Sequence, residues 1–485
     1  MQENVINKIY VDGEFVTPHG TELFDLFNSA TGKVIGQVQL ADEVDTAAAV
    51  AEAKRALPAW SATSKQERIA ALRRLQAAVA AKRNEMLDSA LVEYGAPLPR
   101  NQWMADMAVS AFADMITTLE GFEFTRQVGK ATVEMAPLGV AGLITPWNSD
   151  AFFICNKLAT ALAAGCTAVI KPSEMSAMQT QVVTRALHEA GLPNGVFNIV
   201  TGRGDVVGTA ISRHPDIATI SFTGSGAVGK IILGEAAETF KRVTLELGGK
   251  SPSIILDDAD LEEAVTGALR AGLPNSGQAC VAGTRILVPE SRKDEALAIA
   301  TAQMDDFPVG DPRDPATAIG PMASERQWER VESYIRRGVE EGARIVAGGP
   351  GHPEGLPDGY FVRPTLFADV TNDMTIAREE IFGPVLSILT YRDDDDAVEI
   401  ANDSNYGLNA YVFGSDLERA RRVASRIEAG RVAINGALEP LSPFGGFKQS
   451  GIGREYGTYG LEAFLETRAV MVDERGKDDS VFEGV

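Results

Sequence analysis

Cysteine and histidine are scarce in this 485-residue sequence. The three cysteines, Cys155, Cys166 and Cys280, form no C-x-x-C pair, and the four histidines form no H-E-x-x-H pattern. These absences argue against a disulfide framework and against a zinc site, and they suit a reducing compartment. We therefore expect no metal centre and a cytoplasmic location.

Long apolar runs and an excess of basic residues are also missing. No stretch reaches the roughly 18 apolar residues that a membrane-spanning helix needs, and the start, MQENVINKIY, lacks the basic and apolar regions of a signal peptide. The sequence has 45 Lys and Arg against 67 Asp and Glu, a net charge of −22. So acidic a protein repels nucleic acid and anionic membranes, and we expect neither as a partner.

What is present is typical of a folded globular protein. Hydrophobic residues make up 45% of the sequence and charged residues 23%. The length exceeds what one hydrophobic core usually serves, which predicts at least two domains.

The first part of the sequence has a helical pattern. Residues 42–90 are expected to be helical, with a capping box at Ser64 to Glu67. Pro97 and Pro99 are expected to end this helical region.

From about residue 138, short apolar runs alternate with Ala-rich stretches such as 157–165 and 177–190. Apolar strands separated by helices predict parallel sheets covered on both faces. Two such series occur, with a boundary at Gly248-Gly249, and the acidic run Asp393 to Asp396 is expected to begin a helix. The first series is LGVAGLIT, TAVI, VFNIV, IATISF and VTLEL, and the second is SIIL, RILV, VLSILTY, AYVF and RVAI.

A glycine-rich turn, Gly224-x-Gly226-x-x-Gly229, stands between an expected strand and an expected helix. Such turns let backbone N–H groups approach a pyrophosphate, although glycine turns are also common in α/β proteins without a nucleotide. By spacing alone, Glu246 would then be the ribose ligand.

Seven local motifs occur in one order along the chain. They are PWN (146–148), KPSE (171–174), FTGS (222–225), LELGGKSP (245–252), NSGQAC (275–280), EEIFGP (379–384) and SPFGGFKQSGIGRE (442–455). Together they resemble the aldehyde dehydrogenase superfamily, and the resemblance extends from about residue 7 to 472.

The chemistry of the motifs fits the roles that this resemblance implies. Cys280, which ends a Gly-rich turn, is the candidate nucleophile because a thiolate adds to an aldehyde and later leaves well. Cys155 and Cys166 lie in an apolar segment and are expected to be packing residues. The resemblance makes Asn148 an oxyanion donor and Glu246 the base that activates water for thioester hydrolysis, replacing the ribose role. The structural alternative for Glu246 is a buried, paired carboxylate.

The resemblance also implies the cofactor contacts. Lys171 and Glu174 would grip the adenine ribose, and a carboxylate there repels a 2′-phosphate, which favours NAD over NADP. Trp147 would line the adenosine cleft, and Lys157 would lie near the site in an open role. Glu380 and Phe382 would hold the nicotinamide ribose, Gly224 and Ser225 the pyrophosphate, and further contacts would come from Thr145, Gly204, Gly208, Phe222, Val228 and Leu247.

The substrate region departs from the family pattern. Ser149 and Asp150 follow the PWN motif, where the family often has an aromatic or apolar residue and then proline. Phe152, Phe153 and Asn156 are expected to face the substrate tunnel. Members acting on betaine aldehyde place several aromatic residues around the ammonium group, and Asn156 stands where an aromatic residue would help. Members acting on succinic semialdehyde typically have an arginine at this place. We therefore predict an aromatic or medium aliphatic aldehyde with a polar end.

Other functions remain open at this stage. A CoA-acylating semialdehyde dehydrogenase usually lacks the carboxylate at the position of Glu246. A non-catalytic structural relative would have lost Cys280, and a module that only senses nucleotide would bind NAD without turnover.

The resemblance implies a Rossmann-like cofactor domain, an α/β catalytic domain and a β-hairpin oligomerisation arm. The expected ranges are 1–114 and 138–248 for the NAD-binding domain, 249–448 for the catalytic domain, and 115–137 with 463–480 for the arm. The segment EFTRQVGKATVEMAPLG predicts two strands with Gly129-Lys130 at the turn. An arm with little core of its own predicts a homodimer or homotetramer, and the last residues, 474–485, are expected to be frayed or arm-like.

Overall fold

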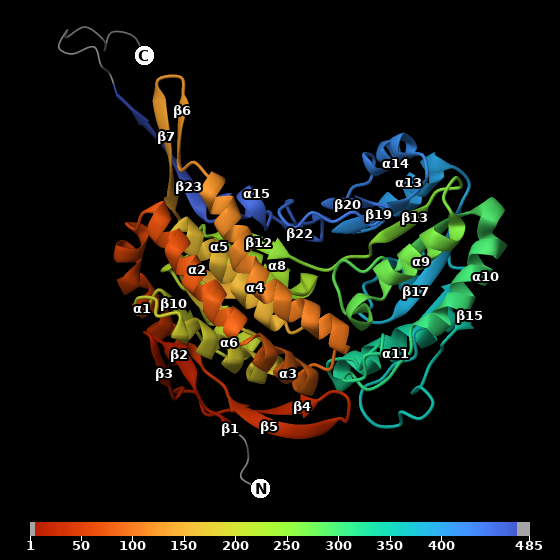
Figure 1. Cartoon of the computed structure of the whole chain (residues 1–485), viewed down its shortest axis with the longest axis horizontal. Coiled ribbons are helices and arrows are strands. Elements are labelled where there is room, and N and C mark those ends of the chain that lie inside the picture. The colour runs from red at the N-terminus through yellow and green to blue at the C-terminus, as the bar shows by residue number, and fades with distance from the viewer. Residues whose placement is uncertain (1–4, 473–485) are drawn as a thin grey trace.

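The computed structural model describes residues 5–472 of the chain. Two large sheets of mainly parallel strands form its body, and helices cover both faces of each sheet (Figure 1). This arrangement confirms the expected α/β fold class.

The first sheet has the order β22-β12-β11-β8-β9-β10-β2-β3. The five strands from β12 to β10 are parallel, whereas β22, β2 and β3 pair antiparallel at the edges. Every residue of β8 and β9 is buried, as parallel strands covered on both faces require. The strands are β2 (Ile9–Val11), β3 (Glu14–Val16), β8 (Val140–Ile144), β9 (Thr167–Lys171), β10 (Phe197–Ile199), β11 (Ile217–Thr223), β12 (Arg242–Glu246) and β22 (Gly451–Ile452).

Two layers of helices cover this sheet. One core joins α2, α4, α5 and α6 to one face, and another joins α1, α7 and α8 to the other. Helix α5 carries no exposed residue, because α4 and the sheet enclose it. The helices are α1 (Glu43–Ser61), α2 (Lys65–Ala81), α3 (Arg83–Glu93), α4 (Leu98–Gly121), α5 (Asp150–Ala164), α6 (Ala177–Glu189), α7 (Thr209–Arg213), α8 (Gly226–Ala237) and α15 (Gly457–Glu462).

The chain crosses to the second sheet at residues 247–251, around the Gly248-Gly249 pair. This sheet has the order β15-β16-β17-β14-β13-β19-β20, and only β15 is antiparallel. Its elements are β13 (Pro252–Ile255), α9 (Leu261–Gly272), β14 (Arg285–Pro289), α10 (Lys293–Gln303), α11 (Glu325–Glu340), β15 (Arg344–Ala347), β16 (Thr365–Ala368), α12 (Thr375–Arg378), β17 (Val385–Tyr391), α13 (Asp394–Asn402), β19 (Asn409–Phe413), α14 (Leu417–Ala424) and β20 (Arg431–Ile434).

Three smaller sheets complete the fold. The strands β6, β7 and β23 form an antiparallel ribbon that projects from the body at the top left of Figure 1. Its hairpin turns at Gly129, whose φ is +60°, as the sequence predicts. The strands of the small sheets are β1 (Val5–Ile6), β4 (Leu23–Asn28), β5 (Lys33–Gln39), β6 (Thr125–Val128), β7 (Ala131–Pro137), β18 (Tyr406–Gly407), β21 (Phe447–Lys448) and β23 (Leu465–Met471).

Several local expectations are confirmed. Ser64 caps α2 through a capping box with Glu67, and Asp393 caps α13 with its side chain. The expected strand runs and the Ala-rich helices also appear in the expected places.

Two expectations about the region around α4 are wrong. Pro97 and Pro99 do not end the helical region, because α4 starts between them; proline is tolerated in a first helical turn, where its missing N–H has no partner to lose. Residues 115–121 do not belong to the arm, since they continue α4 and bury Met115, Ile116 and Leu119 in the core. The expected arm residues 473–480 and the expected frayed end lie outside the described residues.

Candidate active site

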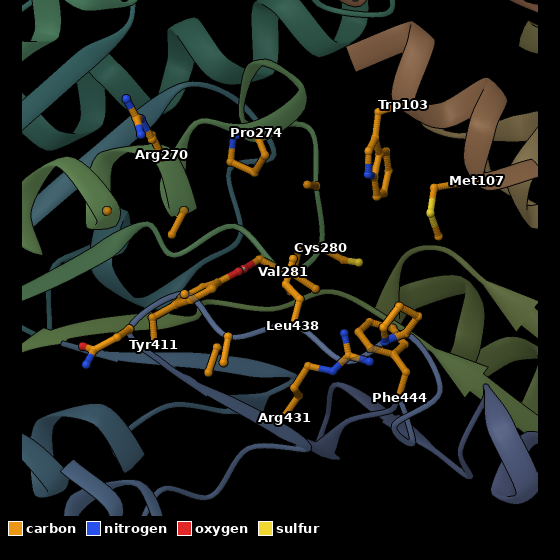
Figure 2. Close-up of a pocket in the computed structure, with 18 of the residues that line it drawn as sticks. Trp103, Met107, Arg270, Pro274, Cys280, Val281, Tyr411, Arg431, Leu438 and Phe444 are labelled. Atoms are coloured by element: carbon orange, nitrogen blue, oxygen red, sulfur yellow. The ribbon is translucent and has the colours of Figure 1, made fainter. Parts of the chain in front are cut away.

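A cavity of about 970 Å³ opens between the two α/β units (Figure 2). Cys280 and Asn148 line it, together with the three expected tunnel residues Phe152, Phe153 and Asn156. The fold thus brings residues from α5 of the first unit against a loop of the second. Glu246 is not among the lining residues.

The turn before Cys280 has an unusual backbone. Asn275, Ser276 and Gly277 have φ values of +55°, +56° and +73°, which form a left-handed turn. Side chains with a Cβ disfavour this region by about 1–2 kcal/mol per residue, so the surrounding structure must hold the turn in place. A Cβ at Gly277 would lie 2.2 Å from the backbone of Gly383, in the EEIFGP motif, which explains the glycine.

Hydrogen bonds from both units hold the turn. The Ser276 hydroxyl accepts from the Gly320 N–H at 2.9 Å, and the Gln278 side chain accepts from the Ala323 N–H at 2.9 Å. The Asn148 Nδ2 donates to the carbonyl of Gln278 at 3.0 Å. An amide nitrogen carries two protons, and Nδ2 has no second acceptor among residues 5–472. Asn148 therefore fixes the turn and keeps a donor available in the cavity.

The Cys280 thiol is partly exposed to the cavity, whereas Cys155 and Cys166 are fully buried in the core. The packing role expected of those two cysteines is confirmed. Burial raises the pKa of the Cys280 thiol to about 12, and the nearby carboxylates of Glu380 and Glu246 add to the effect. The thiol is therefore protonated at neutral pH and needs a base before it can attack.

Glu246 is the last residue of β12, with a 2% exposed side chain. Neither carboxylate oxygen has a hydrogen-bond partner among residues 5–472, so this carboxylate is not the paired group that the structural alternative supposes. Burial raises its pKa well above the usual value, and the charge of Glu455 adds to the effect. A buried carboxyl with no partner is suited to exchange a proton.

An ionic network that the sequence did not predict lies near Glu246. The buried Lys157 ammonium contacts the carboxylate of Glu455 and donates to the Ser221 hydroxyl at 2.7 Å. Ser221 in turn donates to Glu455 at 2.9 Å. Membership of Glu455 in the SPFGGFKQSGIGRE motif was the only available sign, because its partners are far away in the sequence.

The Gly248-Gly249 pair passes between Glu380 and the nucleophile. A Cβ at Gly248 would lie 2.3 Å from the Glu380 carboxylate, and one at Gly249 would lie 2.6 Å from the Cys280 carbonyl. Glu380 accepts a hydrogen bond from the Gly249 N–H at 3.1 Å, and burial raises the pKa of Glu380 to about 7. The double glycine therefore lets Glu380 lie close to the reactive turn.

Several of the expected cofactor residues lie at the carboxyl ends of strands in the first sheet. Lys171 ends β9, and its ammonium lies 3.1 Å from the carboxylate of Glu174. Thr145 follows β8, and its buried hydroxyl has no partner among the described residues. Nucleotides bind at this edge of parallel sheets, and an ammonium, a carboxylate and an orphaned hydroxyl fit a ribose.

The glycine-rich turn lies at the same edge. Gly224 follows β11, and Ser225 caps α8 by accepting from the Val228 N–H at 3.4 Å. A helix N-terminus after glycine-rich backbone fits a pyrophosphate. The other expected residues nearby are Phe222 on β11, Leu247 against Gly229 of α8, and Gly204 and Gly208 in a π-helical turn.

Trp147 packs edge-on against Phe382, with ring centres 5.4 Å apart, and also contacts Tyr94. Phe382 is expected beside the nicotinamide ribose. This contact gives no support to the expectation that Trp147 lines the adenosine cleft.

Two further properties concern the described residues alone. No helix within residues 5–472 has both the length and the apolar character needed to cross a membrane. The same residues contain no group of three or more His, Cys, Asp or Glu side chains arranged to bind a metal ion.

Comparison with known proteins agrees with this geometry. A profile of the aldehyde dehydrogenase family matches residues 15–470. The chain belongs to the aldehyde dehydrogenase family. The membership confirms the resemblance on which the catalytic and cofactor roles were assigned, and it identifies the chain as an oxidoreductase that acts on aldehydes.

Individual relatives are similar over almost their whole length. A 3-succinoylsemialdehyde-pyridine dehydrogenase from Pseudomonas sp. is 46% identical over 96% of this chain and 98% of its own. The structure of an aldehyde dehydrogenase C variant from Pseudomonas syringae with NAD+ and octanal has a TM-score of 0.94 and 43% identity, covering 96% of both chains. An aldehyde dehydrogenase from Mycobacterium tuberculosis in complex with NAD+ has a TM-score of 0.94 and 40% identity, covering 98% of this chain and 100% of that one.

Proposed function

We propose that this aldehyde dehydrogenase uses NAD to oxidise an aldehyde to a carboxylic acid through a thioester on Cys280. The observation that carries the proposal is the shared cavity in which Cys280 lies beside the free amide donor of Asn148. The unpaired, high-pKa carboxyl of Glu246 supplies the base that this chemistry needs.

Each residue has a defined part in the proposed reaction. The Glu246 carboxylate accepts the Cys280 proton, and the sulfur adds to the carbonyl carbon to form a hemithioacetal. Asn148 Nδ2 and the Cys280 N–H donate to its oxyanion. NAD, when bound, would supply the acceptor for the hydride that leaves this carbon. Glu246 then releases the Cys280 proton to solvent and is again a carboxylate. A water molecule attacks the resulting thioester while Glu246 takes one proton from it, the carboxylic acid leaves from the Cys280 thiolate, and Glu246 returns that proton to the thiolate.

The use of NAD rather than NADP rests on Glu174. Its carboxylate lies at the end of β9 beside Lys171, where it would accept from ribose hydroxyls and repel a 2′-phosphate. The Pseudomonas syringae and Mycobacterium tuberculosis structures both contain NAD+. Glu380 and Phe382 would hold the second ribose.

The proposed substrate is an aromatic or medium aliphatic aldehyde with a polar end. Phe152 and Phe153, with ring centres 5.3 Å apart, and the amide of Asn156 line the cavity and provide matching surfaces. One relative supports each half of this class: the first is named for a pyridine semialdehyde, and the second was crystallised with octanal.

We also propose a homodimer or homotetramer assembled through the β6-β7-β23 ribbon. Val128, Val470 and Met471 are exposed on this ribbon, which has little core of its own.

The test is to follow NADH formation by absorbance with the wild type, Cys280→Ala and Cys155→Ala over a panel of aliphatic, aromatic and charged aldehydes. Turnover that disappears only in Cys280→Ala supports the proposal, because Cys155 is a buried packing residue. Turnover that survives in Cys280→Ala overturns it. Added CoA should not raise the rate, since the CoA-acylating alternative is the one that requires it.

A further inference from the structure

Arg431 is a cation in the catalytic cavity with hydrogen-bond donors to spare. It is the first residue of β20, and Figure 2 shows its side chain reaching into the cavity that contains Cys280. One guanidinium nitrogen, Nη2, donates to the Ser442 hydroxyl at 3.1 Å and weakly to its carbonyl at 3.4 Å. The guanidinium carbon lies 5.1 Å from the centre of the Phe444 ring, but the buried Nε has no acceptor, and Arg431 forms no ion pair with any carboxylate between residues 5 and 472.

Other arginines of this protein have acceptors for their guanidinium groups. The fully buried Arg285 donates from all three nitrogens, to backbone carbonyls and to the Asn372 side chain. Arg419 contacts Asp257, Asp258 and Asp394, and Arg378 pairs with Asp403 at 2.6 Å. A partly buried guanidinium is unfavourable when its donors lack acceptors, and its planar fork is matched best by a carboxylate. An unpaired arginine in a ligand cavity therefore indicates that the ligand supplies the anion.

The other charged residues that line the cavity also leave its interior positively charged. Arg100 also lines the cavity, stacks 4.1 Å from the Trp103 ring and leaves its buried Nε without a partner. The acidic lining residues Asp260 and Glu263 are exposed at the start of α9, where Asp260 caps the helix. Asp114 on α4 is half-buried and faces the charge of Glu439. The interior is thus cationic, and the carboxylates stand mainly at its margin.

We propose that Arg431 binds a carboxylate at the far end of the substrate, so that the preferred substrates are ω-oxo carboxylic acids. This inference rests on the proposed aldehyde oxidation at Cys280 and identifies the polar end of its substrate. The sequence pointed away from such substrates because position 156 is Asn rather than Arg. Arg431 supplies the cation from β20 instead, so the absence of an arginine at position 156 does not exclude a semialdehyde with a carboxylate as the substrate.

The alternative role for Arg431 is to adjust the pKa of Glu246, the proposed base. Its charge lowers the pKa of Glu246, although burial and Glu455 act more strongly in the opposite direction. Burial raises the pKa values of Tyr411 and Tyr456, and the positive charge of Arg431 opposes this effect at both. If Arg431 served Glu246, its loss would affect every aldehyde equally and would shift the pH profile.

The experiment compares ω-oxo acids of four to eight carbons with their methyl esters as substrates, because the ester keeps the length and the carbonyl but removes the charge. kcat/KM is measured with NAD for the wild type, Arg431→Gln, Arg431→Lys and Arg100→Gln. Arg100→Gln is the matched control, since it removes another cavity cation.

The proposal predicts that the wild type prefers the acid over the ester at its best length by about tenfold to a hundredfold. Arg431→Gln should abolish this preference mainly through KM on the acids. Any change in kcat or in the pH profile that arises through Glu246 should be the same for acids and esters, and Arg431→Lys should restore part of the preference. Three results would overturn the role of Arg431. They are an equal loss of kcat/KM on acids and esters in Arg431→Gln, a preference for acids that disappears in Arg100→Gln alone, and a wild type that prefers esters. A wild type that oxidises no aldehyde in either series would instead overturn the proposed function itself.

Discussion

The side-chain amide of Asn148 donates to the backbone carbonyl of Gln278, 3.0 Å away and two residues before Cys280. This bond joins the PWN turn of the first unit to the reactive turn of the second. One side chain thereby positions the nucleophile and presents a donor to the cavity.

Replacing Asn148 with Ala should lower kcat by about 10²–10³-fold, the usual effect of losing one oxyanion donor. Asn148→Asp should be at least as damaging, because a carboxylate cannot donate to the Gln278 carbonyl and repels a developing oxyanion. Steady-state kinetics on the best aldehyde of the panel provides the measurement. Retention of more than a tenth of kcat in Asn148→Ala would contradict the donor role.

Glu246→Gln should slow both halves of the reaction, because Glu246 is the proposed base for the Cys280 thiol and for water. Without this base, steady-state turnover should fall by about 10²–10⁴-fold, and any acyl group that forms on Cys280 should remain there because water is not activated. Intact-protein mass spectrometry after incubation with aldehyde and NAD should detect the adduct. Glu455→Gln is a suitable comparison because Glu455 lies in the neighbouring ion pair with Lys157. An unmodified Glu246→Gln protein with normal turnover would rule out Glu246 as the base.

Gly277→Ala should impair the reactive turn through steric overlap. The added Cβ would lie 2.2 Å from the backbone of Gly383, at a φ of +73°. Gly342→Ala is the matched control, because Gly342 has a φ of +96° but no atom within 4 Å of its added Cβ. We expect both variants to lose about 1–2 kcal/mol from the left-handed backbone, and only Gly277→Ala to lose activity as well. Thermal unfolding measures the loss of stability and steady-state kinetics measures the loss of activity. Equal activity in both variants would exclude a steric effect of the Gly277 Cβ on the reactive turn.

Asp150 should make stability depend on pH. It is fully buried, one oxygen accepts from the Thr180 hydroxyl at 3.0 Å, and the other has no partner among the described residues. Burial raises its pKa well above the usual value, and the charge of Glu93 adds to the effect. The folded state therefore favours the protonated form, and stability falls as pH rises from the unfolded pKa, about 4, through the folded pKa.

Asp150→Asn should remove this dependence. It keeps the shape, and near neutral pH it should raise Tm by about 2 °C or more relative to the wild type. The gain should shrink as pH falls towards about 4, and Asp306→Asn, at an exposed position, should show none. A Tm difference between Asp150→Asn and the wild type that stays constant from pH 4.5 to 8 would show that Asp150 does not titrate in this range.

The sequence determined the local structure and the family. Alternating apolar strands and helices predicted both parallel sheets, and Ser64 with Glu67 predicted the start of α2, because period, caps and turns depend on near neighbours. The motifs identified Cys280, Asn148 and Glu246 since each is embedded in a short, distinctive stretch. Prediction from local sequence failed at Pro97 and Pro99, because proline is compatible both with the end of one helix and with the start of another.

Tertiary structure decided which of these residues act together. No local pattern indicated the cavity position of Arg431, the ion pair of Glu455 or the Asn148–Gln278 bond. Each depends on segments that are more than a hundred residues apart or lie in opposite units. Whether Glu246 is paired, and whether Arg431 lacks an anion, are properties of burial and distance rather than of residue type. The sequence therefore specified the reactive groups, and the packing of the two units determined their protonation, their partners and the charge of the cavity they share.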